Sequence, residues 1–393
     1  MRKNKKIIPS IMFHSIGLED HDWVWSHISE PYAFFEKKLQ LISKKYNTIF
    51  WADLYAYMKG EVDLPENSIC LTFDDGYLDN WCYLYPLLKK YQIKATIFVN
   101  PDFVDPSQEL RPFFGQEQLG KTFAGFLNWA EMREMEASGL VDIQSHALTH
   151  TWYFTSPDIV DIYSEESDYK YPWLNWNNNP DKKPFYLSEK VADILPLGTP
   201  IFSHQKSLVA RRFYPDQSVL LDVAKYFQQQ DIARLKKSDA WQELLADYLH
   251  QQHGLEAIPG VYESVDERWE RIRHELRESK LVIENNLNKT VDFICWPGGG
   301  NDEAVCKMAI EEGYKAYTLG SQDQSNFRNL PFSDAQKIKR IGSIHRVVRN
   351  GKYLFDEGAV LLNLKIRAHQ GSLLARLAYK IFVEYKHLMS KKG

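Results

Sequence analysis

Short, mostly apolar runs alternate with segments of helical periodicity through the first part of this chain. Residues 7–13, 68–73 and 93–99 predict buried β-strands, because each run is short and largely apolar. Apolar positions three or four residues apart predict helices at 31–43 and 80–91. A strand–helix–strand order is typical of a parallel sheet with right-handed crossover connections.

The same alternation returns in the second half of the chain. The predicted elements there are helices at 268–287 and 301–312 and strands at 291–296 and 314–319. Residues 151–260 interrupt the pattern, since they are rich in aromatic residues, Asn and Pro and become helical only after residue 218. Long loops inside compact enzymes usually serve as lids or binding loops, so this stretch predicts an inserted cap over the site.

The end of the chain predicts an amphipathic helix at 373–392. Leu374, Leu377 and Ile381 fall on one face, and Arg376 and Lys380 face away from it. Such a helix can pack on the body of the protein. A basic amphipathic helix can also lie on an anionic membrane surface, and the sequence leaves both alternatives open.

Two adjacent carboxylates, Asp74 and Asp75, directly follow the predicted strand at 68–73, and Gly76 comes next. Burying ionised carboxylates is costly unless a cation compensates them. Enzymes built from strands and helices keep their sites at the carboxyl ends of strands, so this strand end is a candidate site. The alternative is a simple turn with a helix cap, since Asp and Gly favour turns.

A second polar group follows another predicted strand at 139–143. His146 and His150 are four residues apart, so they can project to one side of a helical turn and bind one cation through neutral imidazole. A lone pair at this spacing is often only structural. Together with a carboxylate from the Asp-Asp pair, however, the two imidazoles form a ligand set that suits a catalytic divalent metal.

The stretches 72–76 (Thr-Phe-Asp-Asp-Gly) and 145–150 (Ser-His-Ala-Leu-Thr-His) resemble, in this order, the first two motifs of the polysaccharide deacetylases, carbohydrate esterase family four with its NodB-homology domain. The resemblance implies that Asp75, His146 and His150 hold one divalent metal ion. Zn²⁺ is the expected ion, with Co²⁺, Ni²⁺ and Fe²⁺ as alternatives. It also implies that Asp74 is the general base of a hydrolase that removes N-acetyl groups from an acetamido sugar.

The stretch 296–299 (Trp-Pro-Gly-Gly) resembles a variant of the family's third motif. There a backbone N–H just after the proline helps to stabilise the oxyanion, which implies that Gly298 supplies this donor. The arginine that usually orients the base is absent, and Cys295 stands in its place. Arg340 on a late strand is the candidate replacement. The resemblance makes His345 the candidate general acid, with a surface histidine as the alternative.

The fold that these features imply is α/β: a distorted (β/α) barrel of about seven strands with a large inserted cap segment. The resemblance extends over residues 7–150 and 265–347. The expected division of the chain is a first part of the barrel at 1–150, the inserted substrate-recognition segment at 151–260, a second part of the barrel at 261–350 and a C-terminal extension at 351–393.

The composition of the chain limits the kinds of molecule that it is expected to bind. A net charge of −4 argues against a nucleic-acid binder. Aromatic residues make up 14% of the chain, which suits a sugar-binding cleft as well as a core. The expected partner is an acetamido-sugar glycan or a nucleotide-linked or lipid-linked sugar. The candidate substrate contacts are Trp173, Trp176, Arg211, Arg212 and Trp296, of which the arginines suit a phosphate or an acidic sugar.

The four cysteines form no C-x-x-C pair, which predicts buried free thiols rather than disulfides. The basic stretch 1–6 is not followed by an apolar run of signal-peptide length, and no run approaches membrane-spanning length. These features predict a cytoplasmic protein, with peripheral contact at the inner face of the membrane through the C-terminal helix as an option. That location favours a role in cell-surface glycan biosynthesis, such as lipopolysaccharide O-antigen or capsule.

Two other functions fit parts of the pattern. Two histidines and one carboxylate also describe the site of non-haem iron oxygenases, although paired carboxylates on one strand end suit hydrolysis better. The missing third-motif arginine also allows a catalytically inactive sugar-binding barrel.

Overall fold

The computed structural model describes residues 5–17, 28–115, 123–188, 195–319, 327–343, 347–349, 352–355 and 358–391. Its centre is one sheet in which neighbouring strands run parallel. In spatial order the strands are β14 (Lys337–Ile338), β13 (Ala316–Thr318), β12 (Phe293–Ile294), β7 (Val141–Ser145), β6 (Ala95–Val99), β5 (Ser68–Phe73), β1 (Ser10–Phe13) and β15 (Arg340–Gly342). A further strand, β4 (Asn47–Thr48), pairs with β5.

The sheet curls into a nearly closed barrel. Its two end strands, β14 and β15, are separated in sequence only by Lys339. The side chain of Asn329 receives a hydrogen bond from the Lys339 N–H and donates to the carbonyls of Lys339 and Ile8, so it satisfies backbone groups where the strand breaks. Because β14 and β15 form one interrupted strand, the barrel has about seven strand positions, as predicted.

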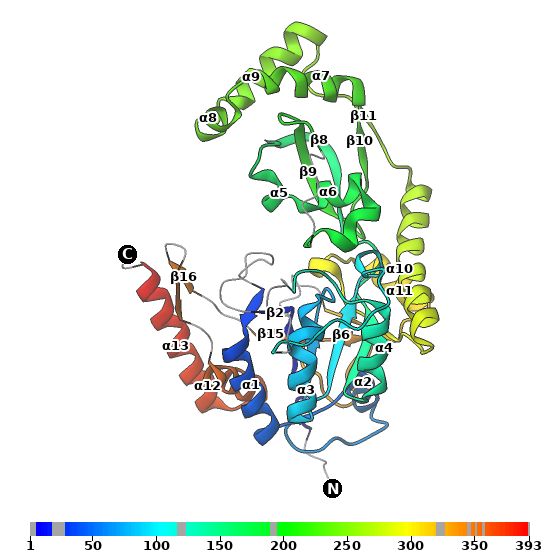
Figure 1. Cartoon of the computed structure of the whole chain (residues 1–393), viewed down its shortest axis with the longest axis vertical. Helices are drawn as coiled ribbons and strands as arrows, with labels where there is room; N and C mark the ends of the chain where they lie inside the picture. Colours follow the sequence, from blue (N-terminus) through cyan, green and yellow to red (C-terminus); the bar gives the residue numbers. More distant parts are fainter. Residues whose placement is uncertain are drawn as a thin grey trace.

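Helices cover the outside of the barrel (Figure 1). They are α1 (Tyr32–Lys45), the π-helical turn η1 (Asn80–Leu84) with α3 (Tyr85–Tyr91), α4 (Trp129–Ala137), α10 (Val265–Leu287), α11 (Glu303–Glu311) and α12 (Ala359–His369). The buried residues of a further helix, α2 (Trp51–Lys59), instead pack with Phe98 and Phe293. Capping boxes begin α4 at Asn128 and α10 at Ser264. On α10 the apolar stripe of Ile272, Leu276 and Ile283 is fully buried, as its periodicity predicts.

The two faces of the barrel strands carry different cores. Phe13 and Phe73 stack 5.1 Å apart in a cluster shared with the covering helices. Cys70, which alternates with these positions, belongs to a second cluster with residues from strands around the whole barrel. Side chains two residues apart share a face of a strand, so Asp74 follows Cys70 towards the barrel interior. All four cysteines are buried free thiols, as predicted.

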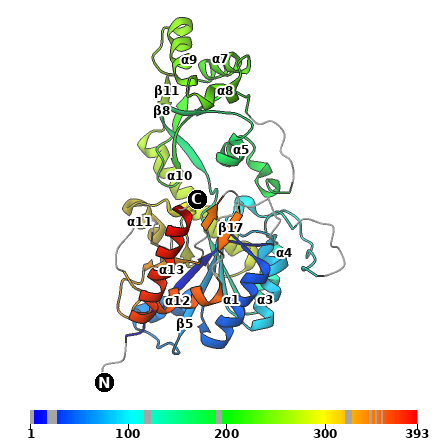
Figure 2. The same ribbon diagram turned by 90° about the vertical axis from the view of Figure 1, so that its left-hand side faces the viewer.

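An inserted lobe lies beyond the mouth of the barrel (Figures 1 and 2). Its framework is an antiparallel pair, β8 (Trp152–Ile162) and β9 (Pro200–Lys206). The other elements are α5 (Ser167–Lys170), α6 (Pro172–Asn178), β10 (Phe213–Pro215), α7 (Gln217–Gln228), α8 (Ile232–Lys237), α9 (Trp241–Tyr248) and β11 (Gly260–Tyr262). The prediction of a loop after residue 151 was wrong, because Pro157 and two aspartates mask an 11-residue strand whose register shifts between Phe154 and Ile159.

The C-terminal helix α13 (Leu373–Lys391) packs beside α12 and is drawn red in Figures 1 and 2. Ala375 is buried, whereas the apolar stripe that includes Leu374, Leu377 and Ile381 is exposed. Short pairs of strands complete the structure: β2 (Ser15–Gly17) with β3 (Ser29–Pro31), and β16 (Val347–Arg349) with β17 (Lys352–Phe355). Among the helices that the structure describes, none is long and apolar enough to cross a membrane.

Candidate metal and catalytic site

The candidate residues meet at one edge of the barrel. Asp74 and Asp75 follow β5, His146 follows β7, and Cys295 follows β12. Because all these strands are parallel, their carboxyl ends lie at the same mouth, where barrel enzymes keep their chemistry. The inserted lobe begins only two residues after His150, so the lobe is joined directly to this mouth.

Asp75, His146 and His150 form the first cluster. The Asp75 Oδ1 lies 3.2 Å from the Nε2 atom of each histidine. Asp75, Ala147 and His150 all have positive φ angles of 74°, 58° and 45°. Such backbone conformations are costly for these residues and concentrate at functional sites. The two histidines therefore converge through an irregular loop, and the prediction that they share a helical turn was wrong.

Neighbouring groups fix the His146 ring. Its Nδ1 is hydrogen-bonded to the Cys295 carbonyl at 2.9 Å, which leaves Nε2 directed at Asp75. The side chain of Asn100, which follows β6, donates to the carbonyls of His146 and Ala147. The His146 ring is thus oriented by the Cys295 carbonyl after β12, and its backbone is held by Asn100 after β6.

The charge of the cluster suits a cation. Burial raises the pKa of the Asp75 carboxyl, but hydrogen bonds from His146 and His150 lower it more, so the net pKa lies well below its usual range. One carboxylate oxygen and two imidazole nitrogens fit Zn²⁺ or a similar divalent ion and leave further positions open. Asp75, His146 and His150 are therefore the residues that would hold it.

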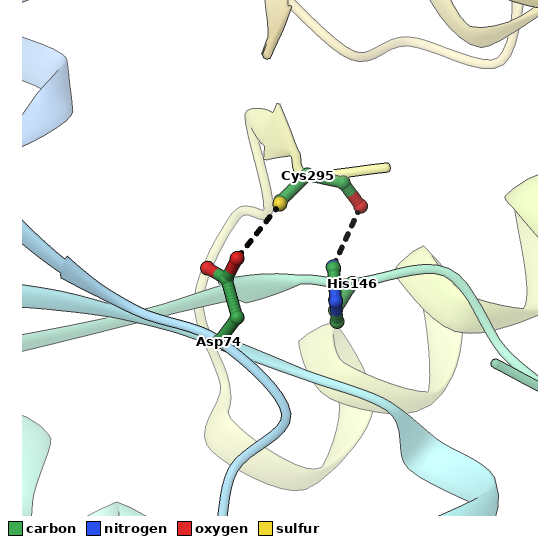
Figure 3. A group of neighbouring side chains, drawn as sticks. All are labelled: Asp74, His146 and Cys295. Carbon is green, nitrogen blue, oxygen red and sulfur yellow. Dashed lines mark hydrogen bonds between the residues drawn. The ribbon is translucent and has the colours of Figure 1, made fainter. Parts of the chain in front are cut away.

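A second group, Asp74, His146 and Cys295, also lies within ligand distance and is drawn in Figure 3. Its donor atoms are already engaged. The Cys295 thiol lies 3.5 Å from Asp74 Oδ2, while the Cys295 carbonyl takes the His146 ring nitrogen that faces it. Both oxygens of Asp74 accept hydrogen bonds from Arg340. This group therefore fits a supporting network better than a second cation site.

Arg340 holds Asp74 as a buried carboxylate. Burial raises the pKa of Asp74, but the positive charges of Arg340 and His146 and the hydrogen bonds from Arg340 leave it below its usual range. Arg340 also donates to Thr72 Oγ1 at 3.2 Å and lies 2.9 Å from the Cys295 sulfur. A guanidinium thus reaches Asp74 from β15, next to the small thiol that stands where the family has its arginine.

The turn after β12 carries the candidate oxyanion donor. Gly298 has φ 53° and ψ 19°, and its carbonyl accepts a hydrogen bond from Lys206 of the inserted lobe. The next two N–H groups, of Gly299 and Gly300, are bonded within the turn at 2.9 and 3.0 Å. The Gly298 N–H forms no hydrogen bond with another described residue.

The structure places the expected substrate contacts at different distances from this cluster. Trp176 has its ring 6.1 Å from that of His150, and its buried Nε1 lacks a hydrogen-bond partner among the described residues. Trp173 instead packs inside the lobe against His204. The described contacts of Arg211 and Arg212 are to Glu263 and nearby tyrosines.

The remaining candidate residues are Trp296, an expected substrate contact, and His345, the expected acid. Trp296 is buried against Tyr317, with ring centroids 5.6 Å apart, rather than exposed to a ligand. His345 lies outside the described residues, and its role as the acid stays a prediction.

Sequence reasoning left several neighbours of the site out of the candidate set. His14, which follows β1, has its Nε2 3.8 Å from Asp74 Oδ2. Glu275 of α10, only 2% exposed, accepts hydrogen bonds from Thr149 of the histidine loop and Ser207 of the lobe. His14 directly follows the strand predicted at 7–13, so the sequence already indicates that it can reach the site, with a structural role as the alternative. Asn100 carries the same signal, a polar residue directly after a barrel strand, which the sequence reasoning did not use. Nothing local in the sequence marks Glu275.

The fold and the cluster together define a class: a (β/α) barrel with a carboxylate–histidine–histidine cluster that could hold a cation and a second, arginine-paired carboxylate at its mouth. Residues 61–171 match the family model described as polysaccharide deacetylase. This matched segment contains both aspartates and both histidines of the cluster.

Two relatives of this chain are also named as deacetylases. The chain is 31% identical over 143 residues to the poly-beta-1,6-N-acetyl-D-glucosamine N-deacetylase of Escherichia coli K12, a match that covers 36% of this chain and 20% of that protein. It is 29% identical over 146 residues to YxkH of Bacillus subtilis, a protein named for the same family, and this match covers 36% of the chain and 43% of YxkH. The chain thus aligns with less than half the length of either relative.

Solved structures extend the likeness of fold beyond the matched segment. A de-N-acetylase from Aggregatibacter actinomycetemcomitans superposes with a TM-score of 0.51 at 17% identity, covering 85% of this chain and 94% of that one. The BpsB deacetylase domain from Bordetella bronchiseptica gives a TM-score of 0.50 at 18% identity, covering 85% and 95%. At these identities the likeness concerns the fold.

Proposed function

We propose that this protein is a metal-dependent carbohydrate N-deacetylase that hydrolyses N-acetyl groups of an acetamido-sugar glycan. The observation that carries the proposal is the placement of an arginine-paired carboxylate, Asp74, beside the cluster of Asp75, His146 and His150. The first carboxylate is free of the cluster and can act on a water molecule, while the second is committed to it. This division of labour between adjacent carboxylates is what amide hydrolysis requires.

Asp74 is the proposed general base. Arg340 keeps it ionised, so it can accept a proton from the water that attacks the acetyl carbon. A divalent cation in the cluster would polarise the acetyl carbonyl and lower the pKa of that water. The attack forms a C–O bond and places a negative charge on the former carbonyl oxygen.

Two further groups complete the reaction. The Gly298 N–H, which has no hydrogen-bond partner among the described residues, is the proposed donor to the oxyanion, since a fixed backbone donor is most effective where charge develops. His345 is the proposed acid that protonates the departing amine as the C–N bond breaks. The products are acetate and the free amine of the sugar.

The arginine pair also bears on the inactive-barrel alternative. That alternative depends on the absence of a third-motif arginine, and Arg340 supplies a guanidinium to Asp74 from another strand at 2.6 and 2.8 Å. This contact favours a working hydrolase over a binding protein.

The proposed substrate is a poly-N-acetylglucosamine-type glycan, as the name of the Escherichia coli relative suggests. A groove of about 1370 Å³ lies between the lobe and the barrel, and its size suits a chain-like ligand. Trp152 lines this groove, and its ring lies 5.6 Å from that of His150. An aromatic face beside a catalytic centre suits sugar stacking. A precursor of such a glycan on a nucleotide or lipid carrier, made during cell-surface glycan assembly in the cytoplasm, is the finer proposal.

We further propose that α13 lies on an anionic membrane surface. Leu373, Leu374, Leu377, Ile381 and Leu388 are 59–82% exposed along this helix. An exposed apolar stripe of this length usually marks an interaction surface. Arg376 and Lys380 are exposed and have no carboxylate partner among the described residues. The helix therefore has both the exposed apolar area and the positive charge that favour binding to an anionic membrane surface.

The experiment that tests the proposed function is acetate release from N-acetylglucosamine oligomers of increasing length, with nucleotide-linked and lipid-linked acetamido sugars in parallel. The proposal expects metal-dependent acetate release, and the most active substrate identifies the carrier. Absence of release from the whole panel by the metal-loaded protein would contradict it.

A further inference from the structure

The lobe touches the barrel at the turn that carries the candidate oxyanion donor. Lys206, the last residue of β9, reaches the turn that follows β12, and its Nζ donates a hydrogen bond to the Gly298 carbonyl. The same lysine lines the groove between lobe and barrel together with Gly299, Gly300 and Asn301. A residue of the inserted segment is therefore built into the wall of the groove and contacts the turn after β12.

The surroundings of Gly300 show how closely Lys206 approaches the turn. Its φ of −78° and ψ of 99° are open to any residue, so the turn itself does not require glycine there. A Cβ at this position, however, would lie 2.7 Å from the Lys206 Cβ and 2.6 Å from its Cδ. Rotation of the lysine cannot move its own Cβ, so a side chain at 300 would push β9 away.

Gly298 responds to the same neighbour in a different way. Its φ of 53° already favours glycine, and an added Cβ would lie 2.9 Å from the Lys206 Cε. Both glycines thus make room for one lysine side chain.

The charge of Lys206 is unusual for this groove. Two other lysines that line it pair with carboxylates: Lys307 with Glu311 at 3.9 Å and Lys337 with Asp334 at 3.2 Å. Lys206 has no carboxylate partner among the described residues, and partial burial lowers its pKa. Its hydrogen bond to the Gly298 carbonyl is therefore its main polar anchor in the described part of the chain.

We infer that Lys206 is a positioning residue that ties the inserted lobe to the oxyanion turn and fixes the direction of the Gly298 N–H. The N–H groups of Gly299 and Gly300 are used inside the turn, so among these three glycines only the Gly298 N–H has no hydrogen-bond partner in the described part of the chain. The Gly298 carbonyl belongs to the peptide that follows Gly298, so the anchor holds this peptide directly and acts on the Gly298 N–H through the φ and ψ angles of a residue whose backbone otherwise rotates easily. The catalytic consequence rests on the proposed function, whereas the anchoring itself does not.

The test compares Lys206→Met, which keeps most of the stem and removes the ammonium group, with Lys337→Met in the same groove. Hydrogen exchange of the peptide spanning residues 296–302 reads the anchoring without substrate. We expect faster exchange in Lys206→Met and no change in Lys337→Met. In acetate release, Lys206→Met should lower kcat about 10- to 100-fold while KM stays within about twofold, since complete loss of an oxyanion donor costs about 100- to 1000-fold. Metal content should be unchanged.

Gly300→Ala is the second variant, matched by Gly358→Ala, whose φ of −61° is equally ordinary and whose added Cβ would meet no atom within 4 Å. Gly300→Ala should reproduce the faster exchange and the loss in kcat, and Gly358→Ala should not. Unchanged exchange in both Lys206→Met and Gly300→Ala would overturn the inference. Faster exchange with unchanged kcat would overturn the positioning role. An inactive wild-type protein with faster exchange in the variants would contradict the proposed function and leave the anchoring supported.

Discussion

The guanidinium of Arg340 donates two hydrogen bonds, of 2.6 and 2.8 Å, to the two carboxylate oxygens of Asp74. Asp74 directly follows β5 and Arg340 begins β15, and β1 pairs with both strands and lies between them. Such forked pairing fixes the plane of a carboxylate as well as its charge. The contact therefore orients the proposed base from a strand 266 residues away.

Replacing Arg340 with Lys tests this orientation. A lysine keeps the positive charge but cannot form the planar fork, so we expect kcat to fall about tenfold or more with little change in KM. Steady-state acetate release measures both constants, and metal content serves as the control for the neighbouring cluster. A kcat within twofold of wild type would show that the fork does not matter to the base.

Replacing Asp74 with Asn separates the base from the cation cluster. The substitution preserves shape and removes proton-accepting capacity, so we expect kcat to fall about 100- to 10,000-fold. Metal occupancy, measured by elemental analysis, should stay near that of the wild type because Asp75 is untouched. Near-normal kcat in this variant would assign the base to another residue.

The local features of the site were predictable from sequence. Asp74, Asp75, His146 and His150 follow strands that short apolar runs mark clearly, and parallel strands bring their carboxyl ends to one edge. The covering helices were predictable for the same reason, because helical periodicity and caps are encoded within a few residues. The predicted helix at 268–287 lies entirely within α10, Val265–Leu287.

Features that depend on distant segments were harder to predict. The break at Lys339 between β14 and β15 is supported by Asn329, a contact that no local pattern signals. The strand β8 was hidden because its faces are not cleanly apolar and polar. The approach of Lys206 to Gly300 depends on the placement of a whole lobe, so glycine-rich sequence alone could not reveal its cause.

Asp79 predicts a pH dependence of stability. Burial raises its pKa to about 7 although Ser15, Ile16 and Asn80 donate hydrogen bonds to it. In the unfolded chain this pKa is about 3.9, so the folded state binds the extra proton and loses stability as pH rises from about 4 to about 7. We expect the midpoint temperature of thermal unfolding, measured with chelator present, to rise for Asp79→Asn relative to wild type as the pH increases from 5 to 8. A constant difference between the two proteins over this range would contradict the prediction.

The exposed stripe of α13 predicts binding to lipid. Wild-type protein should sediment with vesicles that contain anionic phospholipid and much less with neutral vesicles, because apolar burial and charge act together. Leu374→Glu with Ile381→Glu should weaken this binding about tenfold or more, since each change places a charge in the buried face.

Leu221→Glu provides the matched control, because Leu221 is also exposed, at 47%, but lies on α7 of the lobe. Equal sedimentation of wild type and the α13 double variant would contradict the membrane proposal. A concentration-dependent dimer that the double variant abolishes would assign the stripe to a second copy of the chain instead.

The most direct test of the central claim is acetate release from an N-acetylglucosamine oligomer by chelator-treated protein, followed by titration with Zn²⁺. The account predicts negligible release without metal and recovery that saturates near one equivalent. His146→Ala, which removes one of the three donors, should neither retain the ion nor recover activity. Undiminished release by the chelated protein, or full metal occupancy and activity in His146→Ala, would contradict the assignment of Asp75, His146 and His150 as the site.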